Sequence, residues 1–451
     1  MSIARLLGCC LLVVVGLGAQ NVDAPRPVVL FAGACIITGG DGAPIDDGAL
    51  LVENQHIVAI GHRREVRTPA GAVRIDLTGK TVMPAIVDAH VHLGYQRGVT
   101  FAAENFTRAT LVDQLNRYAY AGIAAVLSLG TDAGDLPLQL RAEQAAGRLG
   151  GARYLFAGRG LGAPDGGPGT PELKASAYGV TTEEEARRAV REQIANHVDV
   201  IKIWVDDRNG TVPKLSPALY RAIIDEAHAH QTRVVAHIFY LDDAKDLVRA
   251  GVDGFAHLVR DKEADAELVS LVTSRRVFVM PNLAISENGT HAEAPAWLDD
   301  PLLRETAPPD VIDRVRASFP RRSPAQVQRA AATYGSMQRS LARLSTAGAV
   351  IGFGTDDGAV RDHFYAYTAH RELRLMVEAG MTPSAAIAAA TRVSADFLRL
   401  RDRGTLEAGK RADFIVLDAN PLDDIANTQK IAAVYLDGRK LDRAAMRAAF
   451  K

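Results

Sequence analysis

Eight short β-like runs alternate with helical stretches through the middle of this 451-residue chain, and this alternation constrains the fold more than any other feature. The runs are 82–88, 124–129, 154–157, 200–204, 234–237, 254–257, 277–280 and 350–354. Stretches with charged faces, such as 183–194, 217–230 and 242–250, lie between most of them. Strands that alternate with helices pair in parallel, and eight of them favour closure over an open sheet. The predicted fold class is therefore α/β, a (β/α)8 TIM-like barrel.

Both ends of the chain carry strand signals without helices. Residues 25–80 and 404–451 contain short β-like runs that are separated by turns. Neither block could easily form a stable sheet alone, so we expect one small β-sandwich domain built from both ends, with the barrel at 81–403. The segment 282–334 carries no recognisable motif. In a barrel it would lie over the mouth as a lid-like insertion.

The first 24 residues have the composition of a secretory signal peptide. Arg5 precedes an apolar run, residues 6–17, and small residues follow it. The run is too short for a comfortable membrane span. We expect removal of residues 1–24, export to the periplasm or the medium, and no membrane span in the mature form. A disordered or membrane-tethering N-terminus is the alternative, and the cleavage site stays open.

The overall charge limits the class of partner. The formal net charge is −1, with 48% hydrophobic and 23% charged residues, which is ordinary for a soluble globular protein. No basic surface for nucleic acid is indicated, and we expect a small-molecule substrate as the partner. Homo-oligomer formation is possible, but the sequence does not decide it.

Two His-x-His segments occur in the chain, and the predicted secondary structure separates them. His90 and His92 end the first β-like run, where a spacing of two places both rings on the same face. That arrangement is half of a metal site. His228 and His230 follow a helical stretch, where residues two apart do not share a face. We interpret the second pair as a solvated helix end.

Further polar residues lie at or near the ends of the later β-like runs. They are Lys202, His237, His257 and Asp356. Barrel enzymes place their reacting groups at the C-terminal ends of the strands, so these side chains are expected to converge with His90 and His92. An unpaired ammonium such as that of Lys202 is costly to bury inside an apolar strand, which also indicates a specific role.

With these residues identified, the chain resembles the amidohydrolase superfamily, and within it the imidazolonepropionase-like and prolidase-like enzymes. The resemblance extends over nearly all of the mature chain. The matching motifs are Asp88-Ala89-His90-Val91-His92, Lys202, His237, Gly251-Val252-Asp253 leading to His257, Gly354-Thr355-Asp356 and the tail 404–413. One departure is Phe239, which stands where many relatives carry a polar side chain shortly after the ligand histidine.

The resemblance implies a binuclear, carboxylated-lysine metal site. One divalent ion would be held by His90, His92 and Asp356, and a second by His237 and His257. Lys202 would bridge the two ions after its neutral amine has captured carbon dioxide as a carbamate, because an ammonium has no acceptor of its own. Zinc is the default ion for such imidazole-rich ligation, although manganese or cobalt would also fit. Asp356 would act as the proton-transferring catalytic residue beside a metal-activated hydroxide.

The resemblance also implies hydrolysis of an amide C–N bond. We predict a secreted or periplasmic hydrolase of small peptides or N-acyl amino acids, similar to Xaa-Pro and other dipeptidases or to enzymes that cleave ochratoxin-type amides. Arg159 and Arg208 could bind a substrate carboxylate bidentately, and Tyr240 is a candidate for aligning the scissile carbonyl.

Two alternatives remain at this point. The first is a cyclic amide or amidine hydrolase or a deaminase, against which Lys202 argues. The second is an inactive binding scaffold, against which the complete residue set argues. Of the remaining candidates, Asp357 is predicted to be structural. His363 and His370 are predicted to lie at the surface, and a position lining the mouth of the barrel is the alternative for either.

Overall fold

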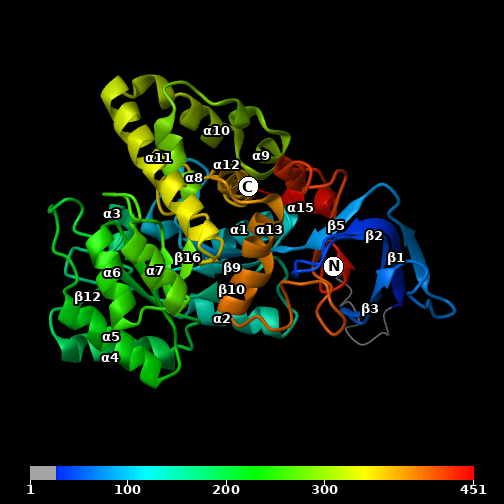
Figure 1. The fold of residues 1–451 in the computed structure, drawn as a ribbon, viewed down its shortest axis with the longest axis horizontal. Coiled ribbons are helices and arrows are strands. Elements are labelled where there is room, and N and C mark those ends of the chain that lie inside the picture. The colour runs from blue at the N-terminus through cyan, green and yellow to red at the C-terminus, as the bar shows by residue number, and fades with distance from the viewer. Residues whose placement is uncertain (1–26, 451) are drawn as a thin grey trace, which may run out of the picture.

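The computed structural model describes residues 27–450, and the predicted signal peptide at 1–24 lies outside this range. Within the described range, no helix combines the length and the apolar character that crossing a membrane requires. Figure 1 shows a sheet-rich part at one end of the molecule and helices surrounding parallel strands at the other.

One eight-stranded mixed sheet joins strands from both ends of the chain. Its order is β20-β19-β18-β5-β1-β2-β3, and β4 pairs with β1. The strands are β1 (Val29–Ile36), β2 (Ile45–Glu53), β3 (His56–His62), β4 (Val73–Asp76), β5 (Thr81–Pro84), β18 (Phe414–Leu417), β19 (Ile431–Leu436) and β20 (Arg439–Lys440). The antiparallel pairing of β5 with β18 connects the two ends of the sequence. Apolar side chains such as Phe31, Leu50 and Phe414 fill one cluster on this sheet.

The first predicted β-like run is divided between two sheets. Residues 81–84 form β5 in the mixed sheet, whereas β6 (Ile86–Val91) pairs in parallel with β9 (Ile123–Ser128). Ala85 lies between them and donates its backbone N–H to Asp413 O at 3.0 Å. One uninterrupted apolar run therefore supplies strands to both sheets, because each half finds different backbone partners.

The parallel strands form two sheets of three and seven strands. The first has the order β10-β9-β6 and the second β12-β11-β13-β14-β15-β16-β17. Besides β6 and β9, these two sheets contain β10 (Arg153–Phe156), β11 (Leu161–Gly162), β12 (Tyr178–Gly179), β13 (Ile201–Val205), β14 (Val234–Ile238), β15 (Gly254–Ala256), β16 (Phe278–Met280) and β17 (Val350–Ile351). Backbone hydrogen bonds also link the two sheets: Asp199 N donates to Phe156 O at 2.9 Å, and Ala89 N donates to Phe353 O at 3.0 Å.

Helices follow most of the parallel strands. They are α1 (Arg108–Tyr120), α2 (Leu136–Ala145), α3 (Pro171–Lys174), α4 (Glu183–Ala195), α5 (Pro217–Ala229), α6 (Leu241–Ala250), α7 (Ala266–Arg275), α12 (Tyr367–Glu378), α13 (Pro383–Ala388), α14 (Ser394–Phe397) and α15 (Arg443–Ala449). The start of α4 illustrates how local sequence fixes where a helix begins. Thr182 caps the backbone N–H of Glu185, and the Glu185 side chain caps Thr182 in return.

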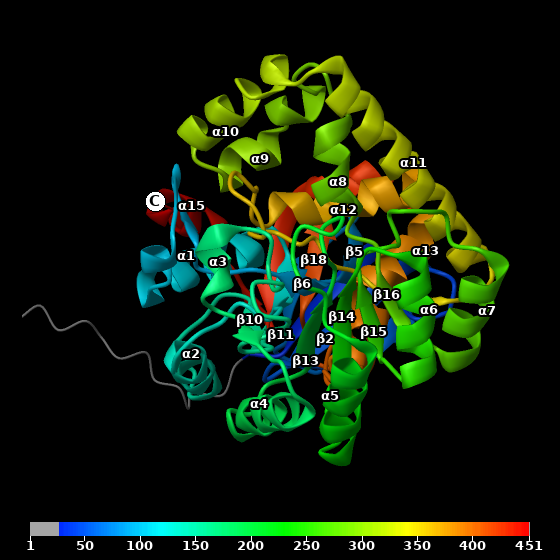
Figure 2. The same ribbon diagram turned by 90° about the vertical axis from the view of Figure 1, so that its left-hand side faces the viewer.

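The predicted insertion is a helical segment. It contains α8 (Leu283–Glu287), α9 (Pro301–Thr306), α10 (Pro309–Arg316) and the start of α11 (Pro324–Thr346). Figure 2 shows α9, α10 and α11 arching over the parallel strands. The boundary that we predicted at Tyr334 falls inside α11, because a capping box at Ser323 starts a 23-residue helix that continues without a break towards β17.

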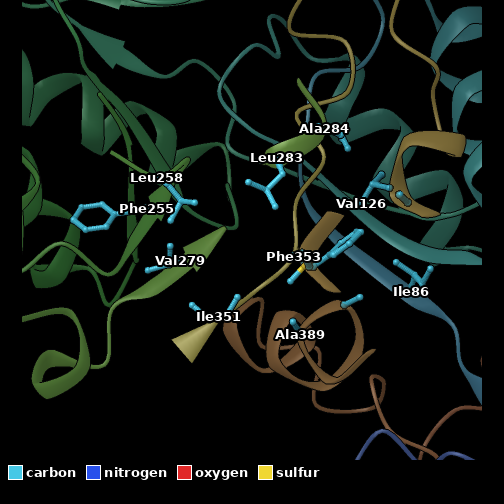
Figure 3. Close-up of a cluster of buried hydrophobic side chains, with 14 of the residues drawn as sticks. Ile86, Val126, Phe255, Leu258, Val279, Leu283, Ala284, Ile351, Phe353 and Ala389 are labelled. Carbon is cyan, nitrogen blue, oxygen red and sulfur yellow. The ribbon is translucent and has the colours of Figure 1, made fainter. Parts of the chain in front are cut away.

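The insertion is attached to the main core at its first helix. Figure 3 shows Leu283 and Ala284 of α8 close to Phe353, with apolar side chains of β6, β9, β15 and β16 around them. Leu283 and Phe353 are both fully buried. Burial of a leucine side chain contributes about 1.5–3 kcal/mol, so the start of the insertion is fixed in place and Asn282, directly before it, is fixed as well.

Candidate metal centre

His90, His92 and Asp356 meet at the ends of β6 and β17. The Asp356 Oδ1 atom lies 3.0 Å from His90 Nε2 and 3.1 Å from His92 Nε2. The two Nε2 atoms are 3.2 Å apart. Asp356 N also donates to His90 O at 2.7 Å, which joins the two strand ends directly. The ligand atoms of these three side chains all lie within 4.8 Å of one another. Among the residues 27–450, no other group of three or more His, Cys, Asp or Glu side chains comes as close together.

The other ring nitrogens of this histidine pair have their own partners. His90 Nδ1 lies 3.2 Å from Asn282 Oδ1, and His92 Nδ1 lies 2.9 Å from Thr131 Oγ1. Asn282 Oδ1 also accepts from His257 N at 3.0 Å. A partner on Nδ1 fixes the ring orientation and leaves Nε2 free as a ligand. Our sequence reasoning missed Asn282 and Thr131, although each follows closely after a β-like run.

His237 and His257 lie next to this group. His257 Nε2 is 3.6 Å from Asp356 Oδ2, and the ring centroids of His237 and His257 are 4.6 Å apart. The centroids of His90 and His257 are 5.4 Å apart. His257 has a φ of 75° and Asp356 a φ of 63°, so both occupy the left-handed region. Such conformations are costly outside glycine and occur preferentially at functional sites.

Lys202 is fully buried in β13, and its Nζ has no hydrogen-bond partner. Burial lowers the pKa of Lys202 to about 7, with a further contribution from Arg260 and opposition from Asp356. Two glycines leave room for its aliphatic stem. A Cβ at Gly130 would lie 2.6 Å from Lys202 Cγ, and one at Gly160 would lie 3.0 Å from the same atom. The sequence therefore makes space for an amine that is buried next to carboxylate and imidazole groups.

The electrostatics favour neutral imidazoles around an ionised carboxylate. Burial lowers the pKa of His90 to about 4 and holds the pKa values of His237 and His257 well below the ordinary range. Although burial alone would raise it, the neighbouring His90 and His257 hold the pKa of Asp356 well below its usual value. Neutral imidazole nitrogens and a carboxylate oxygen are the donors that a divalent transition metal requires.

The residues present therefore fit a divalent metal ion. Two Nε2 atoms and one carboxylate oxygen converge, and a buried amine without a partner lies beside them. Without an ion, the paired ring nitrogens and the orphaned Nζ would be a collection of costly buried polar atoms.

The predicted substrate-binding residues have partners away from this cluster. Arg159 Nη2 donates to Ala177 O at 3.1 Å, and its guanidinium carbon lies 3.7 Å from the Tyr178 ring centroid. Arg208 Nη2 donates to Gly167 O. Tyr240 OH donates to Asp207 Oδ1 at 2.6 Å. Within residues 27–450, no hydrogen bond joins these three side chains to the four clustered histidines. The substrate-binding roles of Arg159, Arg208 and Tyr240 stay predictions.

Two charged residues that the sequence analysis did not select lie at His237. Arg260 Nη2 is 3.0 Å from His237 Nε2, and Asp206 Oδ2 is 3.2 Å from the same nitrogen. Asp206 directly follows β13, so it could have been found by the rule that selected the other strand-end residues. Arg260 lies beyond His257 in a loop, where no periodicity or motif marks it.

The predicted surface positions of His363 and His370 are wrong. His370 is fully buried in α12, where Nε2 lies 2.9 Å from Ala121 O and Nδ1 3.1 Å from Thr428 Oγ1. The helix that carries it packs against the rest of the fold, a contact that a local pattern does not reveal. The His363 side chain is 11% exposed, and its Nδ1 accepts from Gly358 N at 3.1 Å.

Comparisons with known proteins agree with this geometry. A family model described as "Amidohydrolase family" matches residues 81–441. Ochratoxinase from Aspergillus niger is 26% identical over 461 residues, covering 92% of this chain and 86% of that protein. Imidazolonepropionase from Streptomyces griseus is 25% identical, covering 89% of this chain and 95% of that protein. A Bifidobacterium longum crystal structure, provisionally described as a prolidase, is 28% identical with a TM-score of 0.72 and covers 94% of this chain and 98% of that one.

Proposed function

The chain belongs to the amidohydrolase family and is a hydrolase of amide bonds, and from this premise we propose that it is an exported, binuclear metal-dependent enzyme acting on small peptides or N-acyl amino acids. The observation that carries the proposal is the convergence of His90, His92 and Asp356 beside the buried, unpartnered Lys202. The names of the relatives support the reaction class, since ochratoxinase and a prolidase-like structure are among them.

The proposal includes the architecture that would position this site. We take the eight strands β6, β9, β10, β13, β14, β15, β16 and β17 as a closed (β/α)8 barrel at 81–403. One backbone hydrogen bond between β10 and the residues before β13, and several between β6 and the segment after β17, support closure. Residues 25–80 and 404–451 would form the composite small β-domain. The mixed sheet that joins both ends supports this division.

The proposed ligands divide into two groups. His90, His92 and Asp356 would hold one divalent ion, for which zinc is our first choice, and His237 and His257 would hold a second. Lys202 as a carbamate would bridge them. A pKa of about 7 supports this role, because only a neutral amine can attack carbon dioxide. When bound, the ions would activate water and polarise the scissile carbonyl.

Asp356 would then move the proton. As a carboxylate it would accept the proton of the attacking water, and its Oδ2 lies 3.6 Å from His257 Nε2 while Oδ1 contacts His90 and His92. The same oxygen would return the proton to the leaving nitrogen, which makes the amine a viable leaving group. His90 would stay neutral, as its burial favours.

The substrate class and the location extend the proposal further. We infer a substrate with a free carboxylate beside the amide bond, with Arg159, Arg208 and Tyr240 as the side chains predicted from sequence to bind it. Export rests on the signal-peptide composition of residues 1–24, which the structure does not describe.

Metal analysis combined with a substrate panel tests the proposed function. The purified protein should contain close to two divalent ions per chain and hydrolyse Xaa-Pro and other dipeptides or N-acyl aromatic amino acids. Lys202→Ala should lose metal and turnover together, and ¹³C-labelled bicarbonate should give a carbamate NMR signal in the wild type only. Activity confined to cyclic amides or amidines with one ion per chain would support the deaminase-like alternative. Absence of bound metal would support the inactive scaffold.

A further inference from the structure

Arg260 is a largely buried guanidinium at the edge of the metal-ligand cluster. It lies in the loop after β15 and its backbone N–H donates to Phe239 O at 2.8 Å. Its Nη2 donates to Ile238 O at 2.9 Å and lies 3.0 Å from His237 Nε2. The guanidinium carbon is 4.9 Å from the Phe239 ring centroid. The side chain is therefore held in one orientation at the end of β14, with few rotamers left to lose when a ligand binds.

Arg260 forms no salt bridge within the described residues, in contrast to three other well-buried arginines. Arg117, Arg371 and Arg403 are also well buried, with side chains 6%, 12% and 8% exposed, and each forms a salt bridge with an Asp or Glu. No carboxylate oxygen of residues 27–450 lies within 4.0 Å of the Arg260 guanidinium nitrogens. Asp206 and Asp356 favour the charged form without contacting it. A buried guanidinium without a carboxylate in contact is still costly, which points to an anion that is supplied from outside the chain.

The guanidinium also has donors that the protein does not use. Its Nε is buried without a hydrogen-bond partner, and no hydrogen bond from Nη1 is formed within the described residues. A guanidinium presents its donors in a planar fork that matches a carboxylate. Arg371 and Arg403 also have an Nε without a hydrogen-bond partner, but their charge is paired, so Arg260 differs in combining free donors with the lack of a salt bridge. Such a group would suit a planar anion such as a carboxylate.

Asp206 and Arg260 compete for one ring nitrogen. Asp206 Oδ2 lies 3.2 Å from His237 Nε2, the same atom that Arg260 approaches. A ring nitrogen either accepts from Arg260 or donates its own proton to Asp206, but not both. If His237 binds a metal through Nδ1, its Nε2 carries the proton and donates to Asp206. Arg260 Nη2 then loses an acceptor and gains one more free donor.

We propose that Arg260 binds the free carboxylate of the substrate, and that it selects amides with a carboxylate next to the scissile bond. This inference rests on the proposed function and refines it, because it assigns carboxylate recognition to Arg260, which contacts His237, rather than to Arg159 or Arg208, whose hydrogen bonds lie away from the clustered histidines. Phe239 then has a role as well: it covers the guanidinium and helps to exclude water from the pair.

The test compares matched substrates that differ only in the carboxylate. For the best amide in the panel, kcat/KM is measured for the free acid and for its C-terminal carboxamide. In the wild type the acid should be preferred. Arg260→Met should lower the acid-to-carboxamide ratio by about 10- to 100-fold, the range expected for a lost hydrogen bond to a charged group, and Arg260→Lys should lower it less. Because the ratio is taken on one protein sample, partial unfolding of a variant does not change it.

The same substitution at Arg159 and at Arg208 distinguishes the competing assignments. An unchanged ratio in Arg260→Met, or a fall in the ratio in Arg159→Met or Arg208→Met instead, would overturn the inference.

A binding measurement separates this inference from the proposed function. Calorimetric titration of the protein as purified with the product L-proline and with L-prolinamide should give tighter binding of the carboxylate, and Arg260→Met should abolish that difference. If no amide of the panel is hydrolysed, the proposed function fails while the titration still decides the role of Arg260. Equal affinity of the wild type for both compounds would refute the role of Arg260 in carboxylate binding.

Discussion

The chain contains two His-x-His segments, and only one of them brings its ring nitrogens together. His90 and His92 lie at the end of a strand, are 0% and 4% exposed, and point both Nε2 atoms at one oxygen of Asp356. His228 and His230 lie at the end of α5, where their side chains are 42% and 43% exposed. They contact different carboxylates, at 2.8 Å from Asp253 and 3.5 Å from Glu226.

The difference comes from backbone geometry rather than residue type. A strand repeats its side-chain direction every second residue, whereas two residues on a helix are separated by about 200° of rotation. Burial then adds to the difference. The strand pair is desolvated and held by Asn282 and Thr131, and the helix pair stays in water. A motif of three letters acquires a chemical meaning only from the element that carries it.

The largest expected effect is loss of metal at one pair and not at the other. His92→Ala should lower the metal content from two ions per chain towards one and reduce turnover by more than about 100-fold, because even residues behind the ligands typically cost 10- to 100-fold in affinity or activity. His230→Ala should leave both unchanged. Metal analysis after gel filtration and turnover on the best panel substrate provide the readouts. Full metal content in His92→Ala would remove this pair from the proposed centre.

The stability of the protein should also depend on pH through His90, a member of the strand pair. Burial lowers the pKa of His90 to about 4 from an ordinary 6.5, so between these values the unfolded chain binds a proton that the folded chain does not. The stability of the metal-free protein should therefore fall as the pH drops from 6.5 to 4, by on the order of 3 kcal/mol for this group.

Urea unfolding of the chelator-treated protein across this pH range measures the effect. His90→Gln should make the curve less steep, although His237 and His257, whose pKa values are also lowered, keep part of the slope. The same slope in His90→Gln and the wild type would contradict the assignment.

Asn282, which orients the ring of His90, should have a smaller effect on metal binding than the ligand histidines themselves. Asn282→Ala removes the oxygen that lies 3.2 Å from His90 Nδ1 and also accepts from His257 N. We expect metal affinity to fall by about 10- to 100-fold, measured by competition with a chelator. Glu226→Gln, which changes the carboxylate next to His230, is the matched control and should not alter affinity. An unchanged affinity in Asn282→Ala would mean that the ring is oriented by other contacts.

The smallest effect concerns the exposed pair itself. His228→Ala removes one solvent-exposed ion pair with Asp253. The free energy of unfolding should change by no more than about 1 kcal/mol, since exposed pairs contribute little. Thermal unfolding with and without added zinc measures this change, and both conditions should give the same difference. A zinc-dependent difference would indicate that the helix pair binds metal after all.

Several features were predictable because they depend on short-range patterns. The positions of the parallel strands and of α4, α5 and α6 follow from apolar runs and charged helical faces, and the structure has them within a few residues. The strand-end rule selected His90, His92 and Asp356, which the structure brings together. Family membership, expected from the motifs around these residues, is confirmed by the match over 81–441.

Other features were not predictable, because they depend on contacts between distant segments. Nothing local indicates that residues 81–84 leave the following strand to pair with β18, that His370 is buried between Ala121 and Thr428, or that Arg260 reaches His237. Each depends on partners that the chain brings close only after folding.

The sequence by itself determined the elements of this protein and the chemical types at their ends, since side-chain periodicity and strand-end position are properties of a local stretch. The tertiary structure decided which nitrogen of each histidine is free, which amine is sealed from water and which buried arginine forms no salt bridge. Those properties are set by distances and desolvation, and both arise only when separate strands pack around the same few atoms.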